Sequence, residues 1–276
     1  MVNVWENDLL IKIEGNCLLK IHYDLSHIDS YIQANIHIRL EDMESQFGSI
    51  IKRVKKYKEI NKEARILEVG TGTGWFPILC KKHGLCCEGI EICPQFVEYA
   101  IQYGHRYGIK PDIRLGNIEE FDIGVSRYDV VIATSTFEHV EHWKEGIRNI
   151  YDALKPGGLF YFYSTNKFSY RSGEFNFPLY GWLPDKWRYR IRVSKGGENI
   201  MKLGIDFNQF NHFQLKRLFS ELGFTHIYDQ FEIIDSHDLF HPSFLKKTMI
   251  RMIKRIKLLK LLALTFSPGT LFICIK

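Results

Sequence analysis

The chain has 276 residues, of which 45% are hydrophobic, and a formal net charge of +5 at pH 7. This length suits one large α/β domain with additions, and the modest charge argues against nucleic acid as a partner. The chain has no apolar run long enough to span a membrane, and residues 1–10 do not follow a secretion-signal pattern. Its six cysteines include no Cys-x-x-Cys pair, so we expect reduced thiols and a cytoplasmic location.

Residues 1–62 form an N-terminal extension in this interpretation. Two apolar runs, residues 5–13 and 17–23, flank Glu14-Gly15-Asn16, which predicts a small hairpin. Residues 31–57 then predict a helix, because apolar side chains recur at spacings of three and four.

A glycine loop follows the next predicted strand, residues 64–69. The run Glu68-Val69-Gly70-Thr71-Gly72-Thr73-Gly74 has three alternate glycines, which permit a tight turn and let a ligand lie against the backbone. A dinucleotide loop requires Gly-x-Gly-x-x-Gly, but Trp75 or Pro77 occupies the third glycine position. A nicotinamide or flavin dinucleotide is therefore disfavoured, and a glycine-rich turn without a ligand stays open as the alternative.

Polar residues also follow the next three predicted strands. The strand at 85–90 ends at Glu91, that at 112–115 precedes Gly116-Asn117-Ile118, and that at 128–133 stops at Thr134. Strands that alternate with helical patterns predict right-handed crossovers and a parallel sheet. Ligands bind beyond the carboxyl ends of such strands, which is where all these residues fall.

Later motifs complete a resemblance. Phe137-Glu138-His139-Val140 follows the fourth strand, a Leu-Lys-Pro-Gly-Gly turn at 154–158 precedes the fifth, and residues 270–275 predict a last strand. Together with the glycine loop, these motifs resemble class I S-adenosylmethionine-dependent methyltransferases over about residues 60–276. The resemblance implies an α/β fold with a Rossmann-like, mostly parallel sheet of seven strands and an antiparallel last strand. We expect the methyltransferase domain at 63–276, with insertions at 166–210 and 237–268.

The resemblance implies S-adenosylmethionine as the cofactor. Glu91 would bind the ribose hydroxyls, Asn117 the adenine amine, and Ile118 the face of the ring. The expected cofactor-binding residues are Glu68, Gly70, Thr71, Gly72, Gly74, Glu91, Ile92, Asn117, Ile118 and Thr134.

For the chemistry, the chain is broadly similar to O-methyltransferases of ubiquinone biosynthesis, which implies a small-molecule or lipid-linked acceptor oxygen. His139 and His212 are the candidate general bases, with purely structural contacts as the alternative. Some relatives hold magnesium with two glutamates and a histidine around this segment. Glu138 and His139 match that pattern, but Ser135 replaces the first glutamate, so we expect no metal.

Two segments outside the cofactor site have compositions that suggest a function. Residues 166–210 mix aromatic and basic side chains and predict a cap over the acceptor, or else a plain structural insertion. Residues 244–264 predict a basic amphipathic helix, which is typical of a helix that lies on an anionic membrane surface. This favours peripheral association with the inner membrane surface. Packing of the helix on its own domain or on a second subunit stays open, and the sequence predicts no oligomeric state.

Two other functions compete with this interpretation. Methyltransferases acting on adenine or cytosine carry an Asp/Asn-Pro-Pro-Tyr/Phe motif after the fourth strand, whereas this chain has Thr134-Ser135-Thr136-Phe137. Base methylation of that kind is disfavoured, although another RNA substrate stays open. A non-catalytic adaptor with the same fold is the second alternative, and the intact glycines and Glu91 argue against it.

Overall fold

The computed structural model describes residues 9–12, 18–21, 32–33, 35–171, 177–196, 208–234 and 244–276. The first described element is the expected hairpin, in which β1 (Leu9–Lys12) pairs antiparallel with β2 (Leu18–Ile21). Its turn at 14–16 lies outside the described residues.

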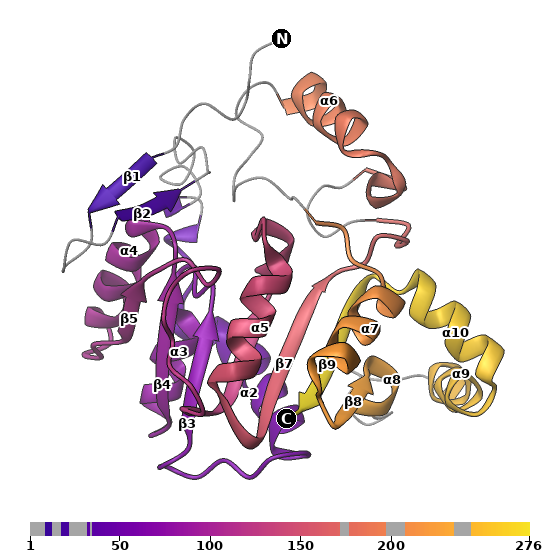
Figure 1. The fold of residues 1–276 in the computed structure, drawn as a ribbon, viewed down its shortest axis with the longest axis horizontal. Coiled ribbons are helices and arrows are strands. Elements are labelled where there is room, and N and C mark those ends of the chain that lie inside the picture. The colour runs from indigo at the N-terminus through magenta and orange to yellow at the C-terminus, as the bar shows by residue number, and fades with distance from the viewer. Residues whose placement is uncertain are drawn as a thin grey trace.

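A seven-stranded sheet forms the centre of the molecule (Figure 1). Its strands, in spatial order, are β5 (Asp112–Leu115), β4 (Cys86–Glu91), β3 (Arg65–Val69), β6 (Tyr128–Thr134), β7 (Leu154–Thr165), β9 (Gly269–Ile275) and β8 (His226–Asp229). β9 runs antiparallel to both of its neighbours, and the remaining pairs are parallel. The predicted fold class is confirmed, including the antiparallel last strand.

The chain direction across the sheet reverses next to β3. From β3 the chain moves outward to β4 and β5, and then returns to place β6 on the other side of β3. Val69 at the end of β3 therefore lies opposite Ala133 near the end of β6. A crevice opens beyond the strand ends at such a switch point, so the fold brings the glycine loop and Thr134 to one place.

Helices cover both faces of the sheet, and each face has its own apolar core. One face carries α2 (Leu40–Lys55), α3 (Trp75–Lys82) and α4 (Pro94–His105). The other carries α5 (Trp143–Ala153) and α7 (His212–Leu222), which lie in front of the sheet in Figure 1. Alternate residues of β7 serve the two cores, with Tyr161 on the α2 side and Phe160 on the α7 side, because strand side chains alternate.

The helix predicted at 31–57 is shorter in the structure, where α2 begins at Leu40 and ends at Lys55. Arg39 is extended, and its backbone N–H donates to Oδ2 of Asp42 at 3.1 Å. This contact caps the start of α2, and residues 36–39 separate it from the helical residues Ile32, Gln33 and Asn35. The predicted apolar face is present: Phe47 and Val54 are buried in the same core as Ile66, so α2 packs as part of the sheet domain.

The prediction of one continuous helix at 244–264 is wrong. The structure has α9 (Phe244–Arg255) and α10 (Lys257–Phe266), separated by Ile256 in an extended conformation. Tertiary contacts hold α10 at the sheet edge. Nζ of Lys260 lies 2.6 Å from Oδ2 of Asp229, and the side-chain amide of Asn166 donates to the carbonyls of Leu264 and Thr265. Within the described part of the chain, no helix combines the length and apolar character needed to cross a bilayer.

The described part of the 166–210 insertion contains η3 (Tyr180–Trp182) and α6 (Asp185–Gly196). Trp182 packs edge-on against Phe168 and stacks on Phe266 at the end of α10, with ring centroids 6.1 Å apart. The insertion therefore contacts the C-terminal helices. A short helix, α8 (Gln230–Ile233), follows β8 directly.

Candidate active site

A cavity of about 890 Å³ extends from the glycine loop to the space between α2 and β7. Its glycine-loop end is formed by Glu68, residues 70–73 and Thr134, together with Trp75 and Phe96. Its α2 end is formed by polar residues of α2, two tyrosines of β7, Gln230, Ile234, Pro268, Gly269 and Leu271. The cavity thus extends from the predicted cofactor loop to α2 and β7.

Glycine is required at the three loop positions for different structural reasons. All have positive φ, at 71° for Gly70, 51° for Gly72 and 76° for Gly74, which favours glycine at each position. A Cβ on Gly70 would collide with the Thr136 side chain, and a Cβ on Gly74 would collide with Ala100. A Cβ on Gly72 would meet no atom within 4 Å. Gly72 is therefore the position where bare backbone faces open space.

Two buried polar atoms without a hydrogen-bond partner lie beside this loop: Oε2 of Glu68 and Oγ1 of Thr71. Both residues line the cavity and are only 3% exposed. Burial raises the pKa of Glu68 well above its ordinary value, and Cys80 and Glu91 add to this. S-adenosylmethionine carries an ammonium and a sulfonium, and a nearby cation would favour the ionised Glu68 carboxylate. The residues present therefore fit this cofactor.

Glu91 is buried beside the loop and supports its shape. Oε2 accepts the Gly72 N–H at 2.7 Å, and Oε1 accepts the Cys93 N–H at 3.0 Å. Burial raises the pKa of Glu91, and the hydrogen bonds from backbone amides oppose this shift. The carboxylate retains further lone pairs, so its proposed contact with the ribose is compatible with this supporting role.

The predicted adenine-binding residues lie away from the described cavity wall. Oδ1 of Asn117 accepts the Glu119 N–H at 3.0 Å, and Ile118 is buried in the core on the α5 side. Ile92 is half-buried directly after Glu91. Of the predicted cofactor residues, the structure brings Glu68, Gly70, Thr71, Gly72 and Thr134 together around the cavity, and Gly74 begins α3.

Neither candidate base lies on the described cavity wall. His139 is half-buried in η2 (Phe137–His139), shortly after Thr134. His212 is buried on the opposite face of the sheet and stacks on Phe272, with ring centroids 4.9 Å apart. Burial lowers the pKa of His212 to about 4, which makes it a weak proton acceptor at neutral pH. This placement argues against His212 as a general base.

The burial of His212 predicts an acid-sensitive fold. Its pKa is about 4 in the folded state against about 6.5 for an ordinary histidine, so the unfolded chain takes up a proton first as the pH falls. The free energy of unfolding should be fully retained above pH 6.5 and fall by about 2 kcal/mol between pH 6.5 and 4, after allowance for solvent screening. Urea titrations of His212→Phe across this range should show a weaker pH dependence than the wild type. His226→Gln, at an exposed position on β8, is the control, and equal slopes for wild type and His212→Phe would contradict this expectation.

Glu138, in the Glu-His segment after β6, makes a structural hydrogen bond inside the protein. Glu138 is fully buried, and its Oε2 accepts the Ser164 hydroxyl at 2.7 Å. Across the described ranges, no group of three or more His, Cys, Asp or Glu side chains is arranged to hold a metal ion.

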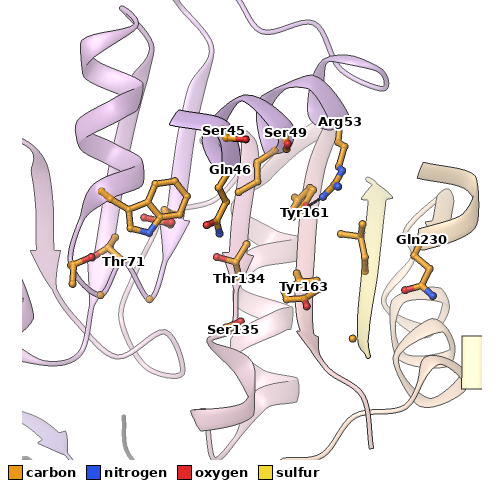
Figure 2. A pocket seen from close by; sticks show the side chains of 18 of the residues that line it. Ser45, Gln46, Ser49, Arg53, Thr71, Thr134, Ser135, Tyr161, Tyr163 and Gln230 are labelled. Atoms are coloured by element: carbon orange, nitrogen blue, oxygen red, sulfur yellow. Dashed lines mark hydrogen bonds between the residues drawn. The ribbon is translucent and has the colours of Figure 1, made fainter. Parts of the chain in front are cut away.

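The family resemblance implies that the helix at 31–57 folds over the cofactor and helps to form the substrate pocket, with a helix that only covers the sheet edge as the alternative. It did not indicate which polar residues of this helix line the cavity. Figure 2 shows Ser45, Gln46, Ser49 and Arg53 extending from α2 toward Tyr161 and Tyr163 of β7. The signal was present as polar residues at 42, 46, 49 and 53, a spacing of three and four that places them on one side of the helix. This polar stripe adjoins the apolar face, and only the apolar positions were used to predict the helix.

Comparison with known proteins identifies the class. Residues 39–228 match a family model described as a methyltransferase domain, which is more than half of the chain. The chain therefore belongs to this family of methyltransferase domains, and the predicted likeness to class I S-adenosylmethionine-dependent methyltransferases is confirmed.

Individual similarities are more distant. The chain is 30% identical over 155 residues to a ubiquinone biosynthesis O-methyltransferase of Rickettsia prowazekii, and the match covers 54% of this chain and 57% of that protein. The chain thus spans little more than half the length of this curated relative. A phosphoethanolamine-type N-methyltransferase of Haemonchus contortus, solved with S-adenosylhomocysteine, matches with a TM-score of 0.53 and 14% identity, over 93% of this chain and 61% of that one. A Haloferax volcanii complex of the Trm112 activator with a methyltransferase matches with a TM-score of 0.52 and 15% identity, over 89% and 96%. At these identities, the two structures support the fold alone.

Proposed function

We propose that this chain transfers the methyl group of S-adenosylmethionine to an oxygen atom of a small-molecule or lipid-linked acceptor. The observation that carries the proposal is the two-ended cavity. One end has the bare backbone of Gly72 and the unpartnered carboxylate oxygen of Glu68, and the other has hydroxyl groups and Arg53. The O-methyltransferase activity named for the Rickettsia relative supports oxygen as the acceptor atom.

The protein's task in this reaction is mainly to position and to shield. The cofactor supplies an electrophilic methyl group on a sulfonium. Glu68 and the glycine loop would bind and orient the donor, and α2 with β7 would hold the acceptor oxygen in line with the methyl group. We propose His139 as the proton acceptor, because the short helix that carries it follows Thr134 and Ser135, which line the cavity.

The proposal is tested with purified protein and S-adenosylmethionine labelled in its methyl group. Calorimetry should detect saturable binding of the cofactor, and mass spectrometry of incubated cell extracts should find label in a small molecule or a lipid. Binding without any labelled product would favour the non-catalytic adaptor, and no heat at millimolar cofactor would remove the cofactor assignment. The same assay on His139→Gln tests the proton-accepting role, which unchanged turnover would exclude.

We further propose that α9 and α10 dock on an anionic membrane surface and so deliver a lipid-linked acceptor. The segment 244–266 carries seven Lys or Arg residues and no acid. Large apolar side chains are exposed along it: Met249, Met252, Ile256, Leu258, Leu261, Leu262 and Phe266. Exposed apolar residues interleaved with exposed cations are the chemistry that an anionic lipid surface binds.

Flotation with vesicles that contain anionic lipid tests this surface. The wild type should float at low salt, and Arg251→Ser with Arg255→Ser should weaken binding by about 30-fold, at about 1 kcal/mol for each cation. The matched control is Lys55→Ser with Arg148→Ser, which removes two exposed cations from α2 and α5. Wild-type protein that stays unbound at low salt, or equal losses in both double variants, would refute membrane docking through α9 and α10.

A further inference from the structure

Arg53 is the one cation on the described wall of the cavity, and no carboxylate in the described part of the chain forms an ion pair with it. Its Nη1 donates to the Tyr161 hydroxyl at 3.1 Å. Of the two acids on the same wall, Asp42 is paired with Arg39, and Glu68 lies at the glycine-loop end. A guanidinium has several N–H donors in a planar fork, so Arg53 keeps donors available for a ligand.

The groups around Arg53 are also suited to donate hydrogen bonds. Burial raises the pKa of both Tyr161 and Tyr163, so both phenols keep their protons at neutral pH. Ser49 lies one helical turn from Arg53 and also lines the cavity. A cation surrounded by hydroxyl donors matches a carboxylate or phosphate, whose oxygens accept several hydrogen bonds at once.

The position of Arg53 favours an anion on the acceptor over the carboxylate of the cofactor. Glu68 of β3 is in register with Ile132 of β6, and Ile132 with Tyr161 of β7, so Tyr161 lies two strands, about 10 Å, from the glycine-loop strand. Figure 2 shows Thr134 and Gln46 between Thr71 and the Arg53–Tyr161 pair. Tyr163 is in register with Thr134 and lies two residues, about 7 Å, beyond Tyr161 along β7.

We propose that Arg53, oriented by Tyr161, binds a carboxylate or phosphate group of the methyl acceptor. This inference rests on the proposed function and narrows the acceptor to an anionic molecule. The register of β7 also indicates its size. We place the methylated oxygen near Tyr163 and Thr134, because Thr134 lies at the glycine-loop end of the cavity, where the methyl donor would bind. With the anionic group at Tyr161, a spacer of about one aromatic ring would then separate the two groups.

The test uses phenyl phosphate and benzoate as probes, titrated by calorimetry into the full chain with and without saturating S-adenosylhomocysteine. The wild type should bind both probes saturably. Arg53→Met should weaken binding at least about 10-fold, because hydrogen bonds to charged groups are strong, and Tyr161→Phe should cause a smaller loss. Arg53→Lys should recover only part of the affinity, because lysine keeps the charge but loses the planar fork. Lys55→Met, an exposed cation on the same helix, is the matched control.

The other outcomes distinguish a failure of this inference from a failure of the proposed function. If the wild type binds S-adenosylhomocysteine but neither probe, the acceptor is not anionic and the proposed function stands. If Arg53→Met weakens S-adenosylhomocysteine as strongly as the probes, the guanidinium serves the cofactor's carboxylate. If S-adenosylhomocysteine itself does not bind, the proposed function fails, and the probe titrations without it still report on Arg53. Competition by short-chain phosphatidic acid, compared with phenyl phosphate, separates a lipid headgroup from a free acceptor.

Discussion

Gly72→Leu is expected to abolish binding of S-adenosylmethionine while the protein stays folded. A Cβ at Gly72 meets no protein atom within 4 Å, so a leucine side chain would enter the cavity where the cofactor has to approach the backbone. Because the Cβ itself meets no neighbour and the residue faces the cavity, we expect the domain to keep its fold. A leucine at position 72, where φ is 51°, is strained by about 1–2 kcal/mol. We expect this strain to lower the melting temperature without unfolding the domain. Calorimetry with the cofactor, alongside circular dichroism, measures both effects.

Gly84→Leu provides the control for backbone strain. Gly84 has a φ of 71°, and a Cβ there also meets no atom within 4 Å, but the residue lies in the turn between α3 and β4 and does not line the cavity. It should lose a similar amount of stability and bind the cofactor normally. Wild-type affinity in Gly72→Leu would show that the ligand does not contact this backbone, and the assignment of the glycine loop would be wrong.

Deletion of residues 270–276 is expected to abolish cooperative folding. These residues supply most of β9, which pairs with β7 on one side and β8 on the other, and five of the seven are buried. Phe272 alone packs against Phe219 and His212, and loss of one such buried aromatic ring costs about 3–5 kcal/mol. A domain has only about 5–15 kcal/mol of net stability, so loss of the whole strand exceeds the margin. Thermal melts followed by circular dichroism would show no transition.

Removal of Lys276 alone is the control that distinguishes the contribution of β9 from that of the C-terminal residue. Nζ of Lys276 donates to the carbonyls of Tyr151 and Leu154 at the end of α5, where a cation also interacts favourably with the helix dipole. Removal of Lys276 alone should cost about 1 kcal/mol and leave a cooperative melt. If the deletion of 270–276 melts like the wild type, β9 does not complete the sheet and the described topology is incorrect.

The sequence predicted the parts of this protein that depend on local backbone chemistry. The parallel strands and the glycine loop follow from strand periodicity, glycine spacing and the rule that ligands bind at strand ends, whereas the seven strands and the antiparallel last strand were implied by the family resemblance. The break at Ile256 could not be predicted, because it arises from contacts of α10 with Asn166 and Asp229, which are distant in the chain. The same applies to Arg53 and Tyr161, which are 108 positions apart and meet only through the fold. The burial of His212 against Phe272 could not be predicted either, because the position of His212 after a loop gave no sign of it.

The end of α10 gives the C-terminal helices a mechanical connection to the reaction space. α10 ends at Phe266, and the cavity wall resumes at Pro268, Gly269 and Leu271. The Asn166 amide clamps this junction through the carbonyls of Thr265 and Ser267, and β9 begins at Gly269. If α10 docks on a membrane as proposed, a displacement of α10 would be passed through Ser267 to the part of the cavity wall formed by Pro268 and Gly269. Membrane attachment of α10 and methyl transfer in the cavity would then be coupled through this short connection.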